Sequence, residues 1–522
     1  MTLRTTGSDI DKYPAKAHAQ RVSDHLGLDS GLILLKGEKS AKFSNSDMPR
    51  PFRQDRYFYY LTGCNEPNCY VAYDIAQDKL TLWLPPINLE RAFYDGRGST
   101  IEEAMDKYDI DEAKYRQSKD KTERLGYMVK NEFIGKDIPF AFNKFPTEVL
   151  KKKKWAEKVD KDLNTQLREA MNASRAVKDE HEIALMRKAN AVSETAHTEV
   201  LKKLATLKHE AEVEAVYTGV CLAKGAKEQS YGPICGAGAN AGQLHYMANN
   251  TAFGDAGTLL IDAGAEWNCY ASDVTRTIPI NPKHPGHWAS TEARQIYEAV
   301  AKVQDSCISL LRPGKKFVQV NWHAQHMVIA ALLDLGILKG GHMEIFHAGT
   351  FMAFFPHGLG HHMGLEVHDV QPPASAKKTD SAWKARFKSA TAEYHEYSEI
   401  FAPEYASTVA RPLQSKERAA NYGLNPATCM YPCAPSAPAL EAGNVVTIEP
   451  GIYFNAFILD NFFLKEEKHA RLINKEVLKR YMHVGGVRIE DDILITRKGY
   501  ENLTTTPKGD NALQIIRDAA TA

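Results

Sequence analysis

The 522-residue sequence lacks an excess of charge of either sign, because lysine plus arginine and aspartate plus glutamate both number 65. A chain without net charge has no general attraction for nucleic acid or for an anionic membrane surface, so we expect neither as a partner. Its 43% hydrophobic and 25% charged residues are typical of a globular protein. The length allows about two or three domains.

Long apolar runs are also absent. The longest, Val328–Leu338, has about half the length of a membrane-spanning helix and contains Asp334. The first residues, Met1–Pro14, are polar and lack the apolar segment of a secretory signal. These features predict a protein that neither crosses a membrane nor enters the secretory pathway.

Cysteine is scarce, with eight residues in the chain, too few for a disulfide scaffold in a protein of this length. Two pairs lie close in the sequence, Cys64 with Cys69 and Cys429 with Cys433. Neither has the spacing and the second pair of a structural zinc site. Together with the missing signal segment, the cysteine content predicts a reducing, cytoplasmic location.

The first part of the chain, residues 1–172, alternates predicted strands and helices. Gly31–Leu35 and Thr81–Leu84 have the pattern of buried strands, and Ile101–Tyr108 has helical spacing. We interpret the aromatic stretch Pro51–Gly63 as core. This part is predicted to be an α/β domain without a catalytic cluster of its own.

The second part, residues 173–522, begins where the composition turns polar, at Asn172–Asp179. A long amphipathic helix is predicted from about Asp179 and a second over Glu210–Leu222. Further on, residues 370–440 are polar and rich in proline. They are too many for an ordinary loop, which predicts an irregular insertion or a lid.

Four acidic residues of the second part end or interrupt predicted strands. Thr258–Asp262 is predicted to be a strand that ends in a carboxylate, and the predicted return strand Asn268–Thr277 contains Asp273. Another strand ends in Glu449, and Gly486–Ile495 alternates with period two, so that Arg488, Glu490 and Asp492 share one face. Because aspartate is disfavoured inside strands, these acids need a functional reason.

Histidine is dense between residues 355 and 368, which contain His357, His361, His362 and His368 together with three glycines. Each glycine costs a helix about 1 kcal/mol relative to alanine, so the imidazoles are expected on an extended or irregular segment. A single histidine is more often a polar loop residue than a ligand. The group becomes a candidate site only because acidic partners exist elsewhere in the chain.

We expect Asp262, Asp273, His361, Glu449 and Glu490 to converge. Carboxylates so close together would repel each other and take up protons unless cations lay between them. Oxygen ligands with one imidazole and no thiolate favour two divalent ions, manganese first, with zinc or cobalt possible. Such a pair, roughly 3.5–4 Å apart, can hold a bridging hydroxide and polarise a carbonyl, which predicts amide hydrolysis without a serine or cysteine nucleophile.

With these residues the sequence resembles the pita-bread metallopeptidases, and among them the eukaryotic prolidases and Xaa-Pro aminopeptidases. The likeness lies in Leu260–Gly264 with Ser272–Thr277, His357–His361 with Val367–Asp369, Glu449–Tyr453, Gly486–Asp491, and an N-terminal stretch, Phe52–Pro67. It covers most of the chain except residues 370–440. It implies an α+β fold in which an N-terminal α/β creatinase/prolidase-like domain is followed by a pita-bread catalytic domain.

The resemblance also implies roles. The five converging residues would be the ligands of two metal ions, with Asp273 and Glu490 bridging both, and Glu449 would pass protons to the leaving nitrogen. The remaining catalytic residues would be His245, His357, His368 and Arg488. The implied substrates are Xaa-Pro dipeptides or short peptides with a free N-terminus, and the implied assembly is a homodimer.

Two departures from the family pattern bear on the substrate. After His368–Val370 the family usually has a glycine pair, whereas this chain has Gln371–Pro373. Prolidases carry an arginine that grips the carboxylate of a dipeptide, but the equivalent stretch, Thr428–Cys433, contains none. Unless Arg411 or Arg418 replaces it, longer peptides should be cleaved at least as well as dipeptides.

A rival hypothesis is a pita-bread protein that binds peptides or other proteins without catalysis, because a fold does not by itself determine a function. Relatives of that kind typically lose metal ligands. All five ligand positions are filled in this chain, which disfavours this alternative. The same residues disfavour a metal-free hydrolase of the creatinase kind.

Overall fold

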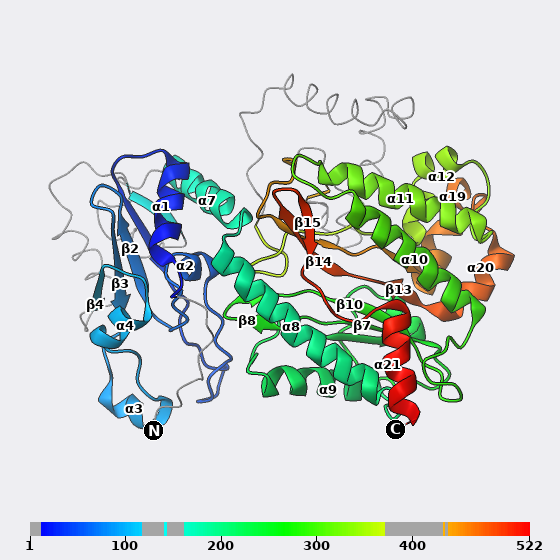
Figure 1. Cartoon of the computed structure of the whole chain (residues 1–522), viewed down its shortest axis with the longest axis horizontal. Coiled ribbons are helices and arrows are strands. Elements are labelled where there is room, and N and C mark those ends of the chain that lie inside the picture. Colours follow the sequence, from blue (N-terminus) through cyan, green and yellow to red (C-terminus); the bar gives the residue numbers. More distant parts are fainter. Residues whose placement is uncertain (1–11, 117–139, 144–160, 371–431, 434–436, 522) are drawn as a thin grey trace, which may run out of the picture. The chain divides into compact units, whose positions relative to one another are not determined.

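The computed structural model describes residues 12–116, 140–143, 161–370, 432–433 and 437–521 (Figure 1). The chain divides into two compact units, Met1–Arg175 and Ala176–Ala522. The border falls inside the last turn of helix α7 (Lys161–Ala176). The predicted insertion at 370–440 lies largely outside the described residues, and so do Arg411 and Arg418.

The first unit is built on a five-stranded sheet with the order β4-β3-β2-β1-β5. Its strands are β1 (Leu32–Lys36), β2 (Tyr70–Asp74), β3 (Lys79–Leu84), β4 (Glu112–Tyr115) and β5 (Phe140–Asn143). The pairs β1–β5 and β3–β4 are parallel, and the other two are antiparallel. The helices are α1 (Ala15–Leu26), α2 (Arg56–Tyr60), α3 (Leu89–Asp95) and α4 (Ile101–Lys107), followed by α7.

The aromatic stretch near residue 55 forms α2 and belongs to the core, as predicted. The side chain of Asp55 caps this short helix by accepting from the N–H groups of Tyr57 and Phe58, both at 3.0 Å. The side chains of Phe58 and Tyr60 are fully buried. Local capping and apolar burial together account for the helix.

The second unit begins with helix α8 (Glu180–Lys203), which has a capping box formed by Asp179 and Glu182. The other helices of this unit are α9 (Glu210–Ala223), α10 (Thr291–Ser309), α11 (Phe317–Asp334), α12 (His342–Ala348), α18 (Ala456–Ile458), α19 (Glu467–Ala470), α20 (Lys475–Tyr481) and α21 (Gly509–Thr521). Among the described residues, no helix is both long and apolar enough to cross a membrane.

The strands of the second unit form four small sheets, with the orders β10-β7-β6, β11-β14-β15, β12-β13 and β8-β9. They are β6 (Ile234–Ala237), β7 (Thr258–Asp262), β8 (Glu266–Trp267), β9 (Tyr270–Ala271), β10 (Thr275–Pro279), β11 (Val445–Ile448), β12 (Gly451–Tyr453), β13 (Gly486–Arg488), β14 (Asp491–Thr496) and β15 (Gly499–Asn502). One apolar cluster joins α8, α9 and α21 to β6 and β7, and a larger one joins α10, α11 and α12 to β11–β14 (Figure 1).

Two strand predictions need correction. The expected return strand Asn268–Thr277 consists of β9 and β10, with irregular backbone at Ser272–Val274 between them. The expected strand Gly486–Ile495 is broken at Ile489–Glu490 into β13 and β14. In both cases the acidic residue of interest lies in the break, where the backbone leaves the regular ladder.

Candidate functional site

The first two carboxylates of the site come from the hairpin of β7 and β10. Strand β7 ends at Asp262, which pairs with Thr275, and Asp273 precedes β10. At Gly264, in the turn between them, a Cβ atom would lie 1.8 Å from the carbonyl oxygen of Ser272. Only glycine permits so close an approach of two backbone segments. This close crossing, within a connection that also contains β8 and β9, therefore brings both carboxylates to the same end of the hairpin.

A tyrosine that the sequence analysis did not single out joins these two carboxylates. The hydroxyl of Tyr231 lies within hydrogen-bonding distance of Oδ1 of both Asp262 and Asp273. Burial and the two carboxylates raise the pKa of Tyr231 well above its usual value, so the phenol stays a neutral donor. Tyr231 lies outside the regular elements, where no periodic pattern marks it.

Pairing with β11 places the histidine. The N–H of His361 donates to Oγ1 of Thr447 at 3.0 Å, and its carbonyl accepts from the N–H of Thr447 at 2.9 Å. At Gly360 a Cβ atom would lie 2.0 Å from the carbonyl oxygen of Thr447, so this approach also requires glycine. The N–H of Glu449 donates to the carbonyl of Leu359 at 2.8 Å. The histidine-rich segment is therefore non-helical, as predicted: it bonds to β11 around His361 and His362 and is irregular elsewhere, and His361 lies next to Glu449.

The last carboxylate lies between β13 and β14. The N–H of Glu490 donates to the carbonyl of Thr275 at 3.1 Å, and Oγ1 of Thr275 donates to Oε2 of Glu490 at 2.7 Å. The backbone of Glu490 thus bonds to β10 of the other sheet. The broken ladder turns this side chain toward the hairpin that carries Asp262 and Asp273.

The predicted ligands converge around the imidazole of His361. Its Nε2 lies 3.4 Å from Oδ2 of Asp273, 3.6 Å from Oε1 of Glu449 and 3.9 Å from Oε1 of Glu490. Ligand atoms of Asp273, His361 and Glu490 all lie within 4.8 Å of one another, close enough to share one ion. Asp262 reaches the group through the shared phenol of Tyr231.

The electrostatics of this cluster are those of crowded, buried carboxylates. Burial, and repulsion by the neighbouring carboxylates, raise the pKa of Glu490 well above its usual value. Burial likewise raises the pKa of Asp273, and it raises the pKa of Glu449 to about 7. Burial alone would lower the pKa of His361, but Asp273 and Glu449 raise it to about 9. The cluster therefore attracts positive charge to the space around His361.

These residues fit a pair of divalent ions. Oε1 of Glu490 is buried and has no hydrogen-bond partner among the described residues. A buried carboxylate oxygen without a donor is unfavourable unless a cation satisfies it. The donors are carboxylate oxygens and one imidazole nitrogen without sulfur, which suits hard or borderline ions such as manganese, cobalt or zinc.

Two of the predicted catalytic residues form a chain of hydrogen bonds beside the carboxylates. Arg488 donates to Oδ2 of Asp262 at 2.5 Å and to the hydroxyl of Tyr453 at 2.9 Å. The same hydroxyl lies 2.9 Å from Nε2 of His357, whose Nδ1 lies 2.8 Å from the carbonyl of Gly358. Since a carbonyl can only accept, Nδ1 donates and Nε2 accepts from Tyr453. Tyr453 is a second residue that sequence patterns did not reveal as functional.

Charge and burial fix the protonation states in this chain. Burial and the charge of Arg488 lower the pKa of His357 to about 3, so the imidazole is neutral. Burial opposes the charge of Arg488, but Tyr453 and the acidic residues raise its pKa above the usual value, so it remains a cation. Arg488 can thus hold Asp262 in a fixed orientation.

The two remaining predicted residues lie at the exposed side of the cluster. The ring of His368 is 4.3 Å from that of His361, edge to face, and the charge of His361 lowers the pKa of His368 to about 3. His245 is exposed, in the loop after the 3₁₀ helix Gly238–Gly242. It is near enough to contribute to the low pKa of both His357 and His368. Both lie where a substrate can reach them.

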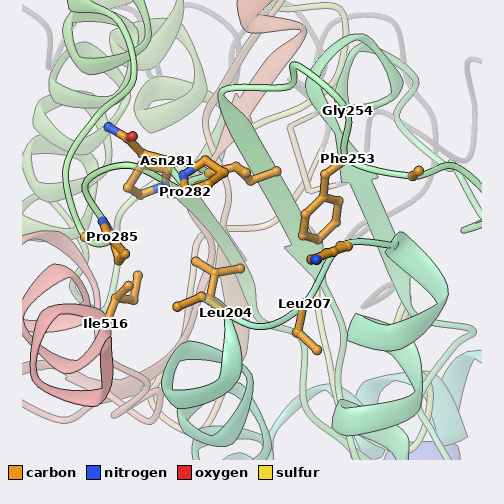
Figure 2. A pocket seen from close by; sticks show the side chains of 14 residues that line it. Leu204, Leu207, Phe253, Gly254, Asn281, Pro282, Pro285 and Ile516 are labelled. Carbon is orange, nitrogen blue, oxygen red and sulfur yellow. The ribbon is translucent and has the colours of Figure 1, made fainter. Parts of the chain in front are cut away.

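A separate pocket of about 300 Å³ opens in the same unit (Figure 2). Leu204, Leu207, Phe253 and Ile516 line it together with prolines of the segment 279–285. Of the described residues that line it, Lys208 is the only charged one, and none carries a carboxylate or an imidazole. This pocket lacks the groups for hydrolytic chemistry, so the acidic cluster is the candidate site.

Comparison with protein families identifies both parts of the chain. The model of the metallopeptidase family M24 matches residues 184–400 and 412–497, and that of the aminopeptidase P N-terminal domain matches residues 16–131. A probable Xaa-Pro aminopeptidase of Pyrenophora tritici-repentis is 44% identical over 524 residues, which cover 98% of this chain and 72% of that protein. One of Aspergillus clavatus is 41% identical over 523 residues, which cover 99% of this chain and 95% of that protein.

Solved structures with the same fold match nearly the whole chain. Aminopeptidase P from Escherichia coli with the inhibitor Pro-Leu has a TM-score of 0.72 and 24% identity, covering 98% of this chain and all of that one. Proline aminopeptidase P II from Yersinia pestis has a TM-score of 0.70 and 24% identity, covering 96% and 99%. The predicted fold class, an N-terminal α/β domain followed by a pita-bread domain, is confirmed.

Proposed function

Because the chain belongs to the metallopeptidase family M24, we propose that it is an Xaa-Pro aminopeptidase, which removes the residue before a proline from the N-terminus of a peptide. The observation that carries this proposal is the convergence of four carboxylates and one imidazole in a cluster without sulfur. The names of the fungal relatives, of which this chain covers most, support the choice of bond.

The residues that would hold two metal ions are Asp262, Asp273, His361, Glu449 and Glu490. When bound, such ions polarise a scissile carbonyl and make water nucleophilic at neutral pH. Tyr231 and Arg488 would fix the orientation of Asp262, since each donates a hydrogen bond to its carboxylate.

The remaining side chains would handle the peptide. Glu449 would carry a proton to the leaving nitrogen of proline. Burial and the charge of Arg488 keep His357 neutral, and its hydrogen bonds to Tyr453 and the carbonyl of Gly358 fix its ring against the cluster. His245 and His368, at the exposed side, would contact the residues around the scissile bond. Because a proline nitrogen carries no N–H, recognition of the bond must rest on such side chains instead of on that donor.

The length of the preferred peptide follows from an absence in the sequence. Thr428–Cys433 contains no arginine that could grip the carboxylate of a dipeptide. Such a charge-assisted contact contributes about 1.5–3 kcal/mol, or roughly 10- to 150-fold in kcat/KM. Without it, Xaa-Pro-Xaa tripeptides should be cleaved at least as fast as Xaa-Pro dipeptides.

The test is hydrolysis by the purified, manganese-loaded protein of a dipeptide, a tripeptide with proline in second place, and a matched tripeptide with alanine there. We expect the proline tripeptide to have a kcat/KM equal to or above that of the dipeptide and well above that of the alanine peptide. A strong dipeptide preference, lost in Arg411→Ala or Arg418→Ala, would show that an arginine of the insertion grips the carboxylate.

The alternative, a peptide-binding module without catalysis, predicts a different result in the same experiment. Metal-loaded protein would then bind the proline tripeptide without releasing its first residue. Full occupancy by metal with no turnover of any of the three peptides would contradict the proposed function. Manganese as the native ion, a homodimer, a cytoplasmic location and a domain border at residue 172 stay predictions from the sequence.

A further inference from the structure

A buried ion pair lies behind the histidine-rich segment. Nζ of Lys178 is 3.2 Å from Oδ2 of Asp369, and each side chain is 1% exposed. Lys178 lies between α7 and α8, and its N–H donates to the carbonyl of Gly443 at 2.8 Å. A Cβ atom at Gly364 would lie 2.4 Å from Oδ2 of Asp369 and 2.7 Å from Cε of Lys178. The segment after His361 is therefore packed directly against this pair.

The pair is connected to His361 through one carbonyl group. The N–H of Asp369 donates to the carbonyl oxygen of His362 at 2.8 Å. Nδ1 of His361 lies 3.1 Å from the same oxygen. Since a carbonyl oxygen only accepts, Nδ1 of His361 must carry a hydrogen, which leaves Nε2, the nitrogen that faces the carboxylates, as the one that can lose its proton and bind a metal. The position of Asp369 thus affects both the tautomer and the orientation of the His361 ring.

The same pair also determines where His368 lies. His368 directly precedes Asp369, and its ring packs edge to face on that of His361 at 4.3 Å. Asp369 is anchored at both its side chain and its N–H, so the residue before it has little freedom. Two histidines of the site therefore depend on a single buried anchor.

We infer that Lys178 and Asp369 are positioning residues, which hold His361 in the tautomer and orientation that bind metal and hold His368 beside it. Both side chains are buried, so they act through the loop of residues 362–369. This inference rests on the proposed function for the role of His368, whereas its statement about His361 requires only that the cluster binds metal.

The test uses Lys178→Met, Asp369→Asn and the double variant, measured against Mn²⁺ alone. A single substitution leaves one buried charge without its partner and lowers Tm, whereas the double variant removes both charges and regains most of that loss. We expect Mn²⁺ affinity to fall by about 10- to 100-fold in the double variant although it is folded. The EPR spectrum of its bound Mn²⁺ should differ from that of the wild type.

A matched control separates positioning from stability. Val300→Ala shortens a fully buried apolar side chain of α10, a helix that carries none of the proposed ligands, and lowers Tm. It should bind Mn²⁺ with wild-type affinity and spectrum. A folded double variant with wild-type Mn²⁺ affinity and spectrum would overturn the inference. A wild-type protein that binds Mn²⁺ but cleaves no Xaa-Pro peptide would overturn the proposed function, while the affinities would still decide the inference about His361.

Discussion

Glu490 and Asp491 are adjacent, both are buried, and their surroundings differ completely. Asp491 accepts from Arg276 at 2.8 Å, from Lys508 at 2.7 Å and from Asn502 at 2.9 Å. Burial alone would raise the pKa of Asp491, but the charges of Arg276 and Lys508 lower it below the usual value. Glu490 lies among other carboxylates, which add to the effect of burial and raise its pKa well above the usual value.

The difference distinguishes a structural carboxylate, Asp491, from a proposed metal ligand, Glu490. The chain places two cations and an amide around Asp491, where the carboxylate only links strands. Among the described residues, it places no lysine or arginine side chain within hydrogen-bonding distance of the carboxylate of Glu490, whose backbone carbonyl accepts from Arg276 at 2.8 Å. The carboxylate of Glu490 is therefore one that a bound cation would stabilise in its charged form.

The largest expected effect is loss of catalysis when a proposed ligand is removed. Asp273→Ala or Glu490→Ala should lower kcat/KM on an Xaa-Pro-Xaa tripeptide by at least about 10³-fold, or about 4 kcal/mol, because the proposed metal site would lose one of its ligands. Metal content by mass spectrometry should fall in parallel. Undiminished metal with full activity in either variant would remove these residues from the ligand set.

A smaller effect is expected on stability. Removing the charge should destabilise the protein at Asp491 and stabilise it at Glu490. In metal-free protein, Asp491→Asn leaves Arg276 and Lys508 without their counter-charge and should cost about 3–5 kcal/mol of unfolding free energy. Glu490→Gln instead relieves repulsion among carboxylates and should raise the urea midpoint. Both are measured by denaturation with chelator present. A loss of stability in both variants would show that the two carboxylates are not in opposite environments.

The smallest expected effect concerns the pH dependence of stability. It comes from a third buried group, His326 of α11, which is neutral in the folded protein. Its Nδ1 lies 2.8 Å from Nε2 of His342, and its ring stacks on Phe346. Burial lowers its pKa to about 4. In the unfolded chain His326 is protonated below about pH 6.5, whereas in the folded protein it stays neutral down to about pH 4. The free energy of unfolding should therefore fall as the pH drops from about 6.5 to 4, by up to about 3 kcal/mol.

The measurement is urea denaturation of metal-free protein at pH 7 and pH 4.5. His326→Gln is the matched variant, since glutamine keeps a polar side chain at this position and does not titrate. It should lose less stability than the wild type between these two values. An identical loss would mean that His326 titrates normally in the folded protein.

Those parts of the site that follow regular strands could be predicted from sequence. Asp262 ends β7 and Glu449 directly follows β11, as expected from the apolar runs before them. Glycines near His361 correctly predicted an irregular or extended segment instead of a helix. In each case, local composition contains the information, because a strand buries apolar side chains and a helix does not tolerate several glycines.

The breaks could not be predicted, because long-range partners cause them. The N–H of Asp273 donates to Oδ2 of Asp492 at 3.1 Å, far along the chain, instead of to a neighbouring strand. The N–H of Glu490 similarly goes to Thr275. Tyr231 was missed for a related reason: its role depends on two aspartates more than 30 residues away, 31 and 42 in sequence. No local period records such contacts.

The close approaches at Gly264 and Gly360 limit how this protein can change by mutation. At both positions a single added carbon would overlap a backbone carbonyl oxygen, which cannot turn away as a side chain can. Every codon change that alters either amino acid therefore displaces a strand that carries a proposed ligand. By contrast, Gly219 has open space around it. Side chains of the site can be replaced one at a time. At the two backbone crossings, however, even alanine, the smallest replacement for glycine, would overlap the neighbouring carbonyl oxygen.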